Sequence, residues 1–568
     1  MEYYILICAV VFLFFIYQAY ASKKERERKL EKLVMENWGK VPCKEYDLEE
    51  FAQISHYYEK TKNQFDFTID DTTWNDIDGD HLFMLCNSCL SSVGQEYLYR
   101  MLRIPQMKEA ELNKRYEMGK YWQEHPEEAR KCRKIFALLG YSKKIALYDY
   151  IHHLEELSKE RNCSNGKHYF SICFFVFSLV CLFCVPPVGV LSIIICLGYN
   201  VSSYYREKAK IDSYYVCLSY ILGMIETTRE IEKAQFSVLK DYEQDFERIQ
   251  KTFEAMEKNH FLLMSGSKMS GGLAETVMEY VRMLLHIDII KFNQMLTIVV
   301  KKKQELELLF ELLGEIEGNL CIGSLMTLMP YTCRPQLTEI SLSPSMKKSS
   351  MELEFKELYH PLIEHPVANS MSEHKSVLIT GSNASGKSTF LKTIALNALF
   401  AQTFYITFAK EYKGNFVHLY SSMALQDNLQ GQESYYMVEI RMLKRVIDAA
   451  GNKIPVLCFI DEVLRGTNTV ERIAASSQIL KDLSGKNAMV FAATHDIELT
   501  EILKEYYANY HFSEEVLADD VKFSYELQHG KAMTRNAIRL LGIMGYDEEI
   551  ISKAEASAKH FIETNSWL

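Results

Sequence analysis

The stretch Val377-Leu-Ile-Thr-Gly381-Ser-Asn-Ala-Ser-Gly386-Lys387-Ser388-Thr389 decides the fold of the C-terminal third of this 568-residue chain. It reads as a buried strand that runs into a G-x-x-x-x-G-K-S-T loop and then into a helix. The glycines let the backbone curl, so that successive N–H groups face phosphates at the helix N-terminus. In such a loop the lysine reaches the β- and γ-phosphates and the next serine ligates Mg²⁺. We therefore predict an ATP site with catalytic Lys387 and metal ligand Ser388, its loop formed by Gly381, Ser382, Asn383, Ala384, Ser385, Gly386, Lys387, Ser388 and Thr389.

Two further apolar strands end in polar residues that suit ATP hydrolysis. Val456 to Ile460 leads into Asp461-Glu462, and Ala488 to Thr494 leads into His495. The first acid of such a pair usually holds Mg²⁺ through water. Its neighbour Glu462 is then placed to orient or deprotonate the attacking water. A lone histidine at a strand end is usually structural, but after the third strand of such a domain a group that senses the γ-phosphate is expected. We predict that Asp461 is a metal ligand and that Glu462 and His495 are catalytic.

The residues around these strands resemble the MutS family. The loop is similar to G-P-N-x-x-G-K-S-T, with Asn383 kept and Ser382 in place of proline. Residues 461–469 resemble D-E-I-G-R-G-T-S-T, with Leu464 in place of glycine, and residues 491–500 resemble F-A-T-H-x-x-E-L-T. Residues 427–440 are similar to D-D-L-x-x-x-x-S-T-F-M-V-E-M. This last resemblance implies that Ser434 reaches the γ-phosphate held by a partner subunit, and hence that the protein acts as a homodimer.

The resemblance is close over residues 350–568 and looser over about 75–345. The looser part opens at Ser91-Ser92-Val93-Gly94 and closes at Leu312 to Gln336. It implies an α/β P-loop ATPase domain of the ABC/MutS-like type, C-terminal to a long-helix α domain of the MutS lever and core type. It also implies ATP and Mg²⁺ as cofactors and DNA as a partner.

Two apolar regions point to a membrane. Residues 3–20 carry no charge and approach the ~20 residues that a spanning helix needs, and five basic residues follow at 23–29. We predict an uncleaved anchor with the remaining chain in the cytoplasm, at the inner membrane; a cleaved signal peptide is the alternative. Residues 169–201 are also without charge, and Pro186-Pro187 divides them as a turn would. We predict a transmembrane hairpin there, with a re-entrant hairpin or a buried helical pair as alternatives.

The predicted organisation follows from these segments. It comprises a transmembrane anchor at 1–22, a juxtamembrane linker at 23–74, a helical core at 75–345 that the hairpin at 169–201 interrupts, and an ATPase domain at 350–568. We expect neither the mismatch-reading domain of MutS nor the Smr nuclease domain that some relatives carry.

Composition restrains the choice of function. The formal net charge of −11 counts against avid DNA binding. The fourteen cysteines show no framework spacing, which suggests a reducing compartment, and Cys86-x-x-Cys89 lacks the second pair that a zinc site needs. The primary hypothesis is a membrane-tethered, dimeric MutS-like ATPase whose DNA binding reads backbone or shape rather than mismatches. The alternative is an ATP-driven mechanical switch on a protein or membrane partner without DNA; a third reading, an ABC transporter, is weaker.

Overall fold

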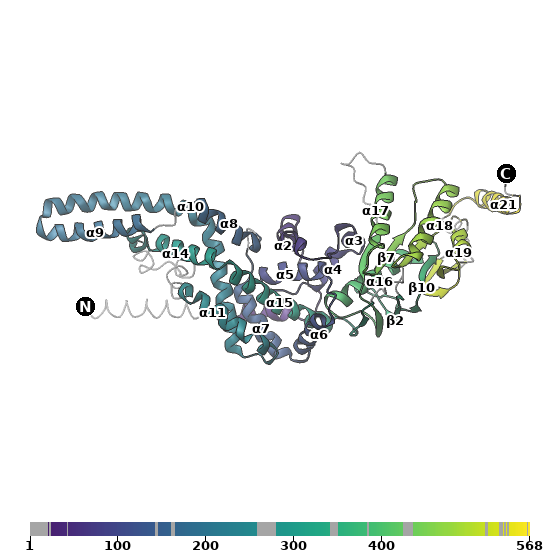
Figure 1. The fold of residues 1–568 in the computed structure, drawn as a ribbon, viewed down its shortest axis with the longest axis horizontal. Coiled ribbons are helices and arrows are strands. Elements are labelled where there is room, and N and C mark those ends of the chain that lie inside the picture. The colour runs from purple at the N-terminus through teal and green to yellow at the C-terminus, as the bar shows by residue number, and fades with distance from the viewer. Residues whose placement is uncertain are drawn as a thin grey trace. The chain divides into compact units, whose positions relative to one another are not determined.

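The computed structural model describes residues 21, 24–25, 27–42, 44–142, 146–160, 165–257, 280–340, 350–382, 385–423, 435–516, 521–532, 538, 541, 545–564 and 566–567. The predicted anchor at 3–20, the loop residues Asn383 and Ala384, and Ser434 lie outside this set. The chain forms two compact units. The first combines residues 1–64, 86–101 and 117–328, and the second combines 65–85, 102–116 and 329–568 (Figure 1).

The first unit is helical. Its centre is α15 (Lys303–Leu328), of which Leu309, Leu313 and Ile316 are fully buried. Gly94, in α5 (Ser92–Arg103), packs directly against this helix, since a Cβ there would lie 2.0 Å from Glu317 Oε2. The other long helices of the unit are α2 (Leu48–Thr61), α7 (Pro126–Leu139), α8 (Leu147–Glu160), α9 (Gly166–Cys184), α10 (Pro186–Ala234), α11 (Glu243–Glu257) and α14 (Ile287–Lys301). Helix α6 (Glu109–Glu124) begins in the second unit and ends in the first.

Helices α9 and α10 form a hairpin over the predicted apolar region. The turn is tight, because Val185 N donates to Cys181 O at 2.7 Å and Gly189 N donates to Val185 O at 3.0 Å. Gly189 is required there, since a Cβ would lie 2.3 Å from Leu182 Cα. Both helices are long and apolar enough to cross a membrane, and only 17% and 28% of their apolar windows are buried. The structure thus confirms the helical pair and shows that it is largely exposed.

The second unit contains two sheets. A six-stranded sheet has the order β10-β9-β4-β8-β7-β6, in which only the pairing of β10 with β9 is antiparallel. Its strands are β4 (Ser376–Thr380), β6 (His418–Ser422), β7 (Val456–Asp461), β8 (Ala488–Thr494), β9 (Tyr507–Val516) and β10 (Val521–His529). A four-stranded sheet has the order β1-β5-β2-β3, from β1 (Gln336–Thr338), β2 (Leu353–Leu358), β3 (Asn369–Glu373) and β5 (Glu411–Asn415). The three strands predicted from sequence are β4, β7 and β8, which lie centrally and are almost entirely buried.

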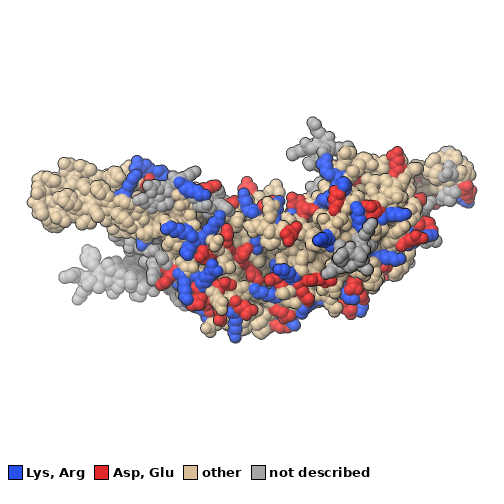
Figure 2. All heavy atoms as spheres, viewed as in Figure 1, with Lys and Arg blue, Asp and Glu red and all other residues tan. Residues whose placement is uncertain are grey.

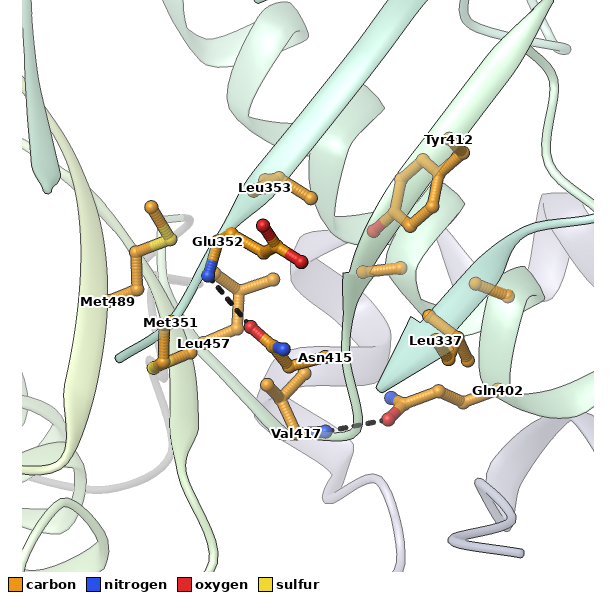
Figure 3. A pocket seen from close by; sticks show the side chains of 12 residues that line it. Leu337, Met351, Glu352, Leu353, Gln402, Tyr412, Asn415, Val417, Leu457 and Met489 are labelled. Carbon is orange, nitrogen blue, oxygen red and sulfur yellow. Dashed lines mark hydrogen bonds between the residues drawn. The ribbon is translucent and has the colours of Figure 1, made fainter. Parts of the chain in front are cut away.

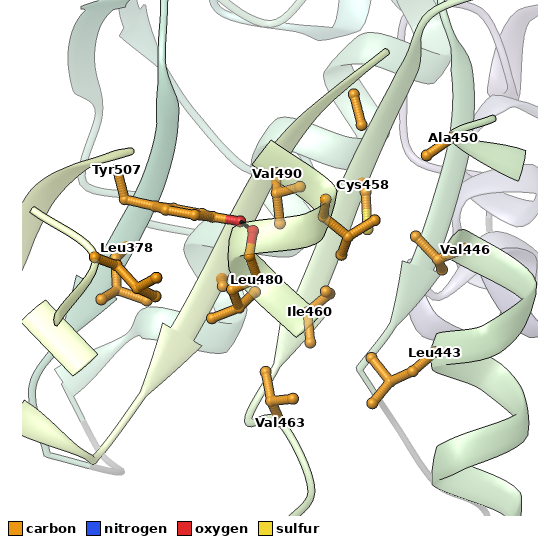
Figure 4. Packing of buried hydrophobic residues seen from close by; sticks show 14 of the residues in the cluster. Leu378, Leu443, Val446, Ala450, Cys458, Ile460, Val463, Leu480, Val490 and Tyr507 are labelled. Atoms are coloured by element: carbon orange, nitrogen blue, oxygen red, sulfur yellow. Dashed lines mark hydrogen bonds between the residues drawn. The ribbon is translucent and has the colours of Figure 1, made fainter. Parts of the chain in front are cut away.

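Helices cover the larger sheet and bury its apolar strands. Leu443 of α17 (Tyr435–Ala449) and Leu480 of α18 (Thr469–Gly485) pack against Ile460 and Val490 (Figure 4). The alternate strand residues point to the other face, where α16 (Lys387–Thr403) contacts β7 and β8. Burial on both faces explains why these strands are continuous apolar runs.

A small cavity lies among the residues that join the two sheets (Figure 3). Gln402 Oε1 accepts from Val417 N at 2.7 Å, and Asn415 Oδ1 accepts from Glu352 N at 2.8 Å. The cavity measures about 10 Å³, close to the space of one water molecule. It is therefore too small to be a ligand site.

Residues 65–85 belong to the second unit, although most of that unit is formed by residues 329–568. They contain α3 (Asp71–Asp76) and α4 (Gly79–Cys86), and α3 packs on the edge strand β6. Asp76 Oδ2 accepts from Ser421 Oγ at 2.5 Å and from Met423 N at 2.9 Å. Asp70 pairs with Arg445 of α17 at 2.5 Å. No sequence pattern signals this packing, and the predicted linker boundary at 74/75 falls inside α3.

Candidate nucleotide site

The glycine-rich loop occupies the position that the sequence predicts, between the buried strand β4 and helix α16. Gly381 and Gly386 have φ of +147° and +99°, which L-residues with a side chain rarely adopt. Space is also limited at Gly381, where a Cβ would lie 2.8 Å from Ser385 Oγ. Ser382, which replaces the family's proline, donates its hydroxyl to Glu514 Oε2 at 2.5 Å. The substitution therefore links the loop to β9.

Lys387 lies at the first position of α16 and turns back into the loop. Its Nζ donates to Gly381 O at 2.8 Å and to Ser382 O at 2.7 Å. Burial lowers the pKa of Lys387 to about 8, against the opposing effect of the Asp461 and Glu462 carboxylates. The loop thus holds a buried ammonium group that a phosphate would stabilise. Ser388 follows in the same turn and is partly exposed.

The two acids lie where β7 ends. Asp461 is the last residue of that strand and is paired in register with Ala493 of β8. Glu462 N donates to Ala493 O at 3.0 Å, so the backbone fixes this residue beside the end of β8. Glu462 and Leu464 have φ of +60° and +59°. Left-handed backbone costs a residue with a side chain about 1–2 kcal/mol, which explains why glycine suits the position of Leu464 in the resembling motif.

The Glu462 carboxylate is held by two basic side chains. His495 Nε2 lies 2.9 Å from Oε1, and Arg465 Nε donates to Oε2. Burial raises the pKa of Glu462, but the hydrogen bonds from His495 and Arg465 outweigh that effect and hold its pKa at about 2. The side chain is only 16% exposed. These two basic partners therefore favour the ionised form of Glu462 and fix its orientation.

A second layer of contacts fixes these basic groups. Arg472 of α18 forms a bidentate ion pair with Asp496, in which Nε donates to Oδ2 at 2.9 Å and Nη2 donates to Oδ1 at 2.6 Å. Asp496 directly follows His495, so the pair ties the histidine loop to α18. The backbone N–H of Arg465 donates to Glu439 Oε1 at 3.0 Å.

The structure brings together Lys387, Asp461, Glu462 and His495, which sequence reasoning placed in one site, but their chemical roles stay predictions. Ser434, Asn383 and Ala384 lie outside the described residues. Sequence reasoning missed the contributions of Glu439, Arg465 and Arg472. Arg465 lies in the 461–469 motif and Glu439 in the 427–440 motif. Their place in these motifs could have marked them as site residues. No sequence pattern predicts the pairing of Arg472 with Asp496.

The residues at the two strand ends suit a magnesium ion. A serine hydroxyl and an aspartate are oxygen ligands of the kind that Mg²⁺ takes at phosphate sites. Ser388 and Asp461 are both partly exposed, and they follow and end two parallel strands, β4 and β7, that flank β8. The donor set therefore fits Mg²⁺. Among the described residues, no group of three or more His, Cys, Asp or Glu could hold a metal ion independently.

The fold and the loop define the class of this unit as a mixed α/β domain with a mainly parallel sheet, in a chain that also forms a helical unit. Comparison with known proteins gives the family. Residues 377–562 match the family model described as MutS domain V. Residues 377–562 are therefore similar to domain V of MutS, which makes this part of the chain MutS-like.

Individual relatives agree with this assignment. The DNA mismatch repair protein MutS of Thermus aquaticus is 31% identical over 202 residues, which cover 35% of this chain and 25% of that protein. MutS of Thermotoga maritima is 30% identical over 216 residues, 36% and 27% of the two chains. MutS of Thermus thermophilus is 25% identical over 366 residues, 63% and 39%. The chain thus spans about a quarter to two-fifths of the length of these relatives.

Proposed function

We propose that this chain is a MutS-like ATPase that hydrolyses ATP at the loop 381–389. The observation that carries the proposal is the Glu462 carboxylate, which is ionised and fixed by His495 and Arg465 beside the buried ammonium of Lys387. Lys387 would exchange its two carbonyl partners for phosphate oxygens. Glu462 would take a proton from the attacking water, and His495 would hold the carboxylate in place. Ser388 and Asp461 would hold Mg²⁺, which neutralises charge on the phosphates.

The test is ATP turnover by the full chain in detergent, measured with wild type and with Lys387→Ala and Asp461→Ala. We expect turnover that requires Mg²⁺ in the wild type and none above background in either variant. Folding of each variant would be checked by its thermal melting temperature. Equal turnover in all three proteins would overturn the assignment.

We further propose that the active unit is a homodimer in which Ser434 of one copy completes the site of the other. The support is the resemblance of residues 427–440 to the MutS motif and the match of the domain to MutS domain V. Ser434→Arg should abolish turnover while nucleotide binding to single subunits persists. A turnover rate per subunit that does not depend on concentration in a monomeric sample would contradict this proposal.

The proposed partner is DNA, as the relatives' role in DNA mismatch repair suggests, and the proposed location is the inner membrane with the ATPase unit in the cytoplasm. Residues 3–20 and the α9–α10 hairpin are the proposed membrane contacts.

Retention of the chain on duplex DNA tests the proposed partner, and this retention should fall steeply as the salt concentration rises. The exposed apolar hairpin and the net charge of −11 support the second candidate, an ATP-driven switch that acts on a membrane or protein partner. Unchanged ATP turnover with no DNA retention at low salt would favour that candidate.

A further inference from the structure

The α9–α10 hairpin has a polar base that is buried within the helical unit. His168 Nδ1 lies 2.8 Å from His286 Nδ1, and His286 Nε2 lies 3.0 Å from the carbonyl oxygen of Asn200. Asn200 Nδ2 donates to Leu284 O at 3.0 Å, and Ser171 donates its hydroxyl to Asn200 Oδ1. The side chains of His168, His286, Asn200 and Ser171 are at most 7% exposed. The paired polar groups mark the level at which the hairpin leaves the packed protein.

Beyond this base the hairpin presents an apolar surface. Phe177 and Phe183 on α9 are 60% and 86% exposed, and Leu191 and Ile194 on α10 are both 61% exposed. The sequence has no Asp, Glu, Lys or Arg between Lys167 and Arg206. Figure 2 shows the hairpin as a surface free of charge, with basic side chains near its base. Soluble proteins rarely expose an apolar patch of this extent, so the surface requires an apolar partner.

Basic and aromatic residues at the base indicate that this partner is lipid. Lys167 and Arg206 are exposed near the base, where they can meet anionic headgroups. Tyr169 and Tyr205, two positions before Ser171 and five after Asn200, are 48% and 60% exposed. Tyrosine prefers the membrane–water interface, where its ring meets acyl chains and its hydroxyl meets water.

The turn is suited to hydrocarbon rather than to water on the far side of a membrane. It reads Val185-Pro186-Pro187-Val188-Gly189, without a polar side chain. The two prolines have no N–H group, and the N–H groups of Val185 and Gly189 are both bonded within the turn. A helix start normally leaves four N–H groups unpaired, a cost that hydrocarbon would make severe. This turn avoids most of that cost.

Although each helix is long enough to cross a membrane, the part of the hairpin beyond its polar base is too short to do so. Ser171 and Asn200 define the polar base, and the turn at Val185 lies fourteen and fifteen positions away along the two helices. At ~1.5 Å per residue the tip reaches ~21–22 Å beyond the base, whereas the hydrocarbon core is ~30 Å thick. Full crossing would draw the His168–His286–Asn200 cluster into the hydrocarbon.

We propose that the α9–α10 hairpin is re-entrant: its tip ends within the bilayer, and its base lies at the headgroups of the cytoplasmic leaflet. The occupant of the apolar surface is the acyl region of the lipid. This inference rests on the proposed membrane attachment and differs from a hairpin that crosses. Both hairpin ends remain on the cytoplasmic side.

The test is the accessibility of a cysteine at the tip to a membrane-impermeant maleimide. Val188→Cys in the full chain is compared with the parent chain, and the extra label is counted in intact cells, in inverted membrane vesicles and after detergent. Tyr205→Cys, at the base of the same hairpin, is the matched control and should be labelled in inverted vesicles. We expect Val188→Cys to gain a label only in detergent.

The other outcomes are distinct. Labelling of Val188→Cys in intact cells would show that the tip reaches the far side, which overturns the re-entrant hairpin but leaves the membrane attachment standing. Labelling in inverted vesicles would place the tip in the cytoplasm, and would overturn insertion of the hairpin altogether. Protection that disappears after a carbonate wash, with the chain still in the membrane pellet, would identify a peripheral protein as the occupant and refute lipid. Val188→Lys provides a second variant: a tip in hydrocarbon predicts reduced recovery in membranes, and unchanged recovery contradicts it.

Discussion

Replacement of Glu462 by glutamine separates a catalytic role from a structural one. Glutamine has nearly the same shape and keeps one carbonyl oxygen, but it cannot take a proton from water. General-base catalysis contributes about 10²–10⁴ in rate, which corresponds to about 2.7–5.4 kcal/mol of barrier. We expect ATP turnover by Glu462→Gln to fall by that factor while ATP binding stays within about threefold.

The structural cost of the same change is smaller. Glu462 accepts from both His495 and Arg465, and glutamine can accept from only one of them. A hydrogen bond to a charged group contributes about 1.5–3 kcal/mol. Because the Arg465 side chain is 54% exposed, water can replace its lost partner. The substitution should therefore lower the free energy of unfolding by about 1 kcal/mol. This loss of stability predicts a fall in melting temperature of about 2–4 °C, which is far too small to explain a loss of turnover.

The pH dependence of this stability cost gives an independent check. Because the folded pKa of Glu462 is about 2, its stabilising contribution is complete above its ordinary value of 4.5. The contribution is lost as pH falls through the folded value. The difference in stability between wild type and Glu462→Gln should therefore shrink between pH 4.5 and 2.

The assay is multiple-turnover and single-turnover ATP hydrolysis by the full chain, with Glu505→Gln as a control of the same chemical change at an exposed position. Turnover by Glu462→Gln within threefold of wild type would refute the assignment of the general base. A variant that loses ATP binding as severely as turnover would show that the residue serves binding instead.

Four further outcomes are expected. ATP affinity should fall about tenfold between pH 7 and 9, because Lys387 has a pKa of about 8 without ATP and bound phosphate favours its charged form. Equilibrium ATP binding across that pH range is the measurement, and an affinity that does not change with pH would contradict the contact between Lys387 and phosphate. Gly94→Ala should lower the free energy of unfolding by about 3 kcal/mol because its Cβ would overlap Glu317; in urea unfolding the control Gly485→Ala, which meets open space, should change it by less than about 1 kcal/mol. The full chain should remain in membranes after carbonate extraction, and release by salt alone would refute the anchor. Its DNA affinity at one fixed salt concentration should be equal within about threefold for matched duplex and duplex with a G·T mispair, because backbone contacts carry no mismatch information; a tenfold preference would show mismatch reading.

The sequence predicts the positions of the candidate nucleotide-site residues because each group of them lies close together in sequence. The loop 381–389 and the acids at 461–462 each follow one strand, and parallel strands bring their carboxyl ends to one edge. What could not be predicted depends on contacts between distant segments. The packing of Asp76 against Ser421 joins residues 345 positions apart, and neither residue lies in a periodic or glycine-rich pattern.

The hairpin shows the same division. Hydropathy and Pro186-Pro187 predict two apolar helices and the turn between them. The sequence could not give the level at which the hairpin emerges, because that level is set by His286 and Leu284, more than eighty positions after Asn200.

The placement of α3 on β6 has a consequence for how the second unit could be expressed on its own. The chain passes between the two units five times, so no single cut separates them. Thr73 and Asp76 accept hydrogen bonds from Ser421 N and Met423 N, which are donors at the outer edge of the sheet. A fragment that starts at residue 350 would leave those donors unpaired on an edge strand, the feature by which sheets recruit other chains and aggregate. The second unit is therefore not an independent C-terminal segment. A soluble fragment of it has to include residues 65–85, either fused or added as a separate peptide.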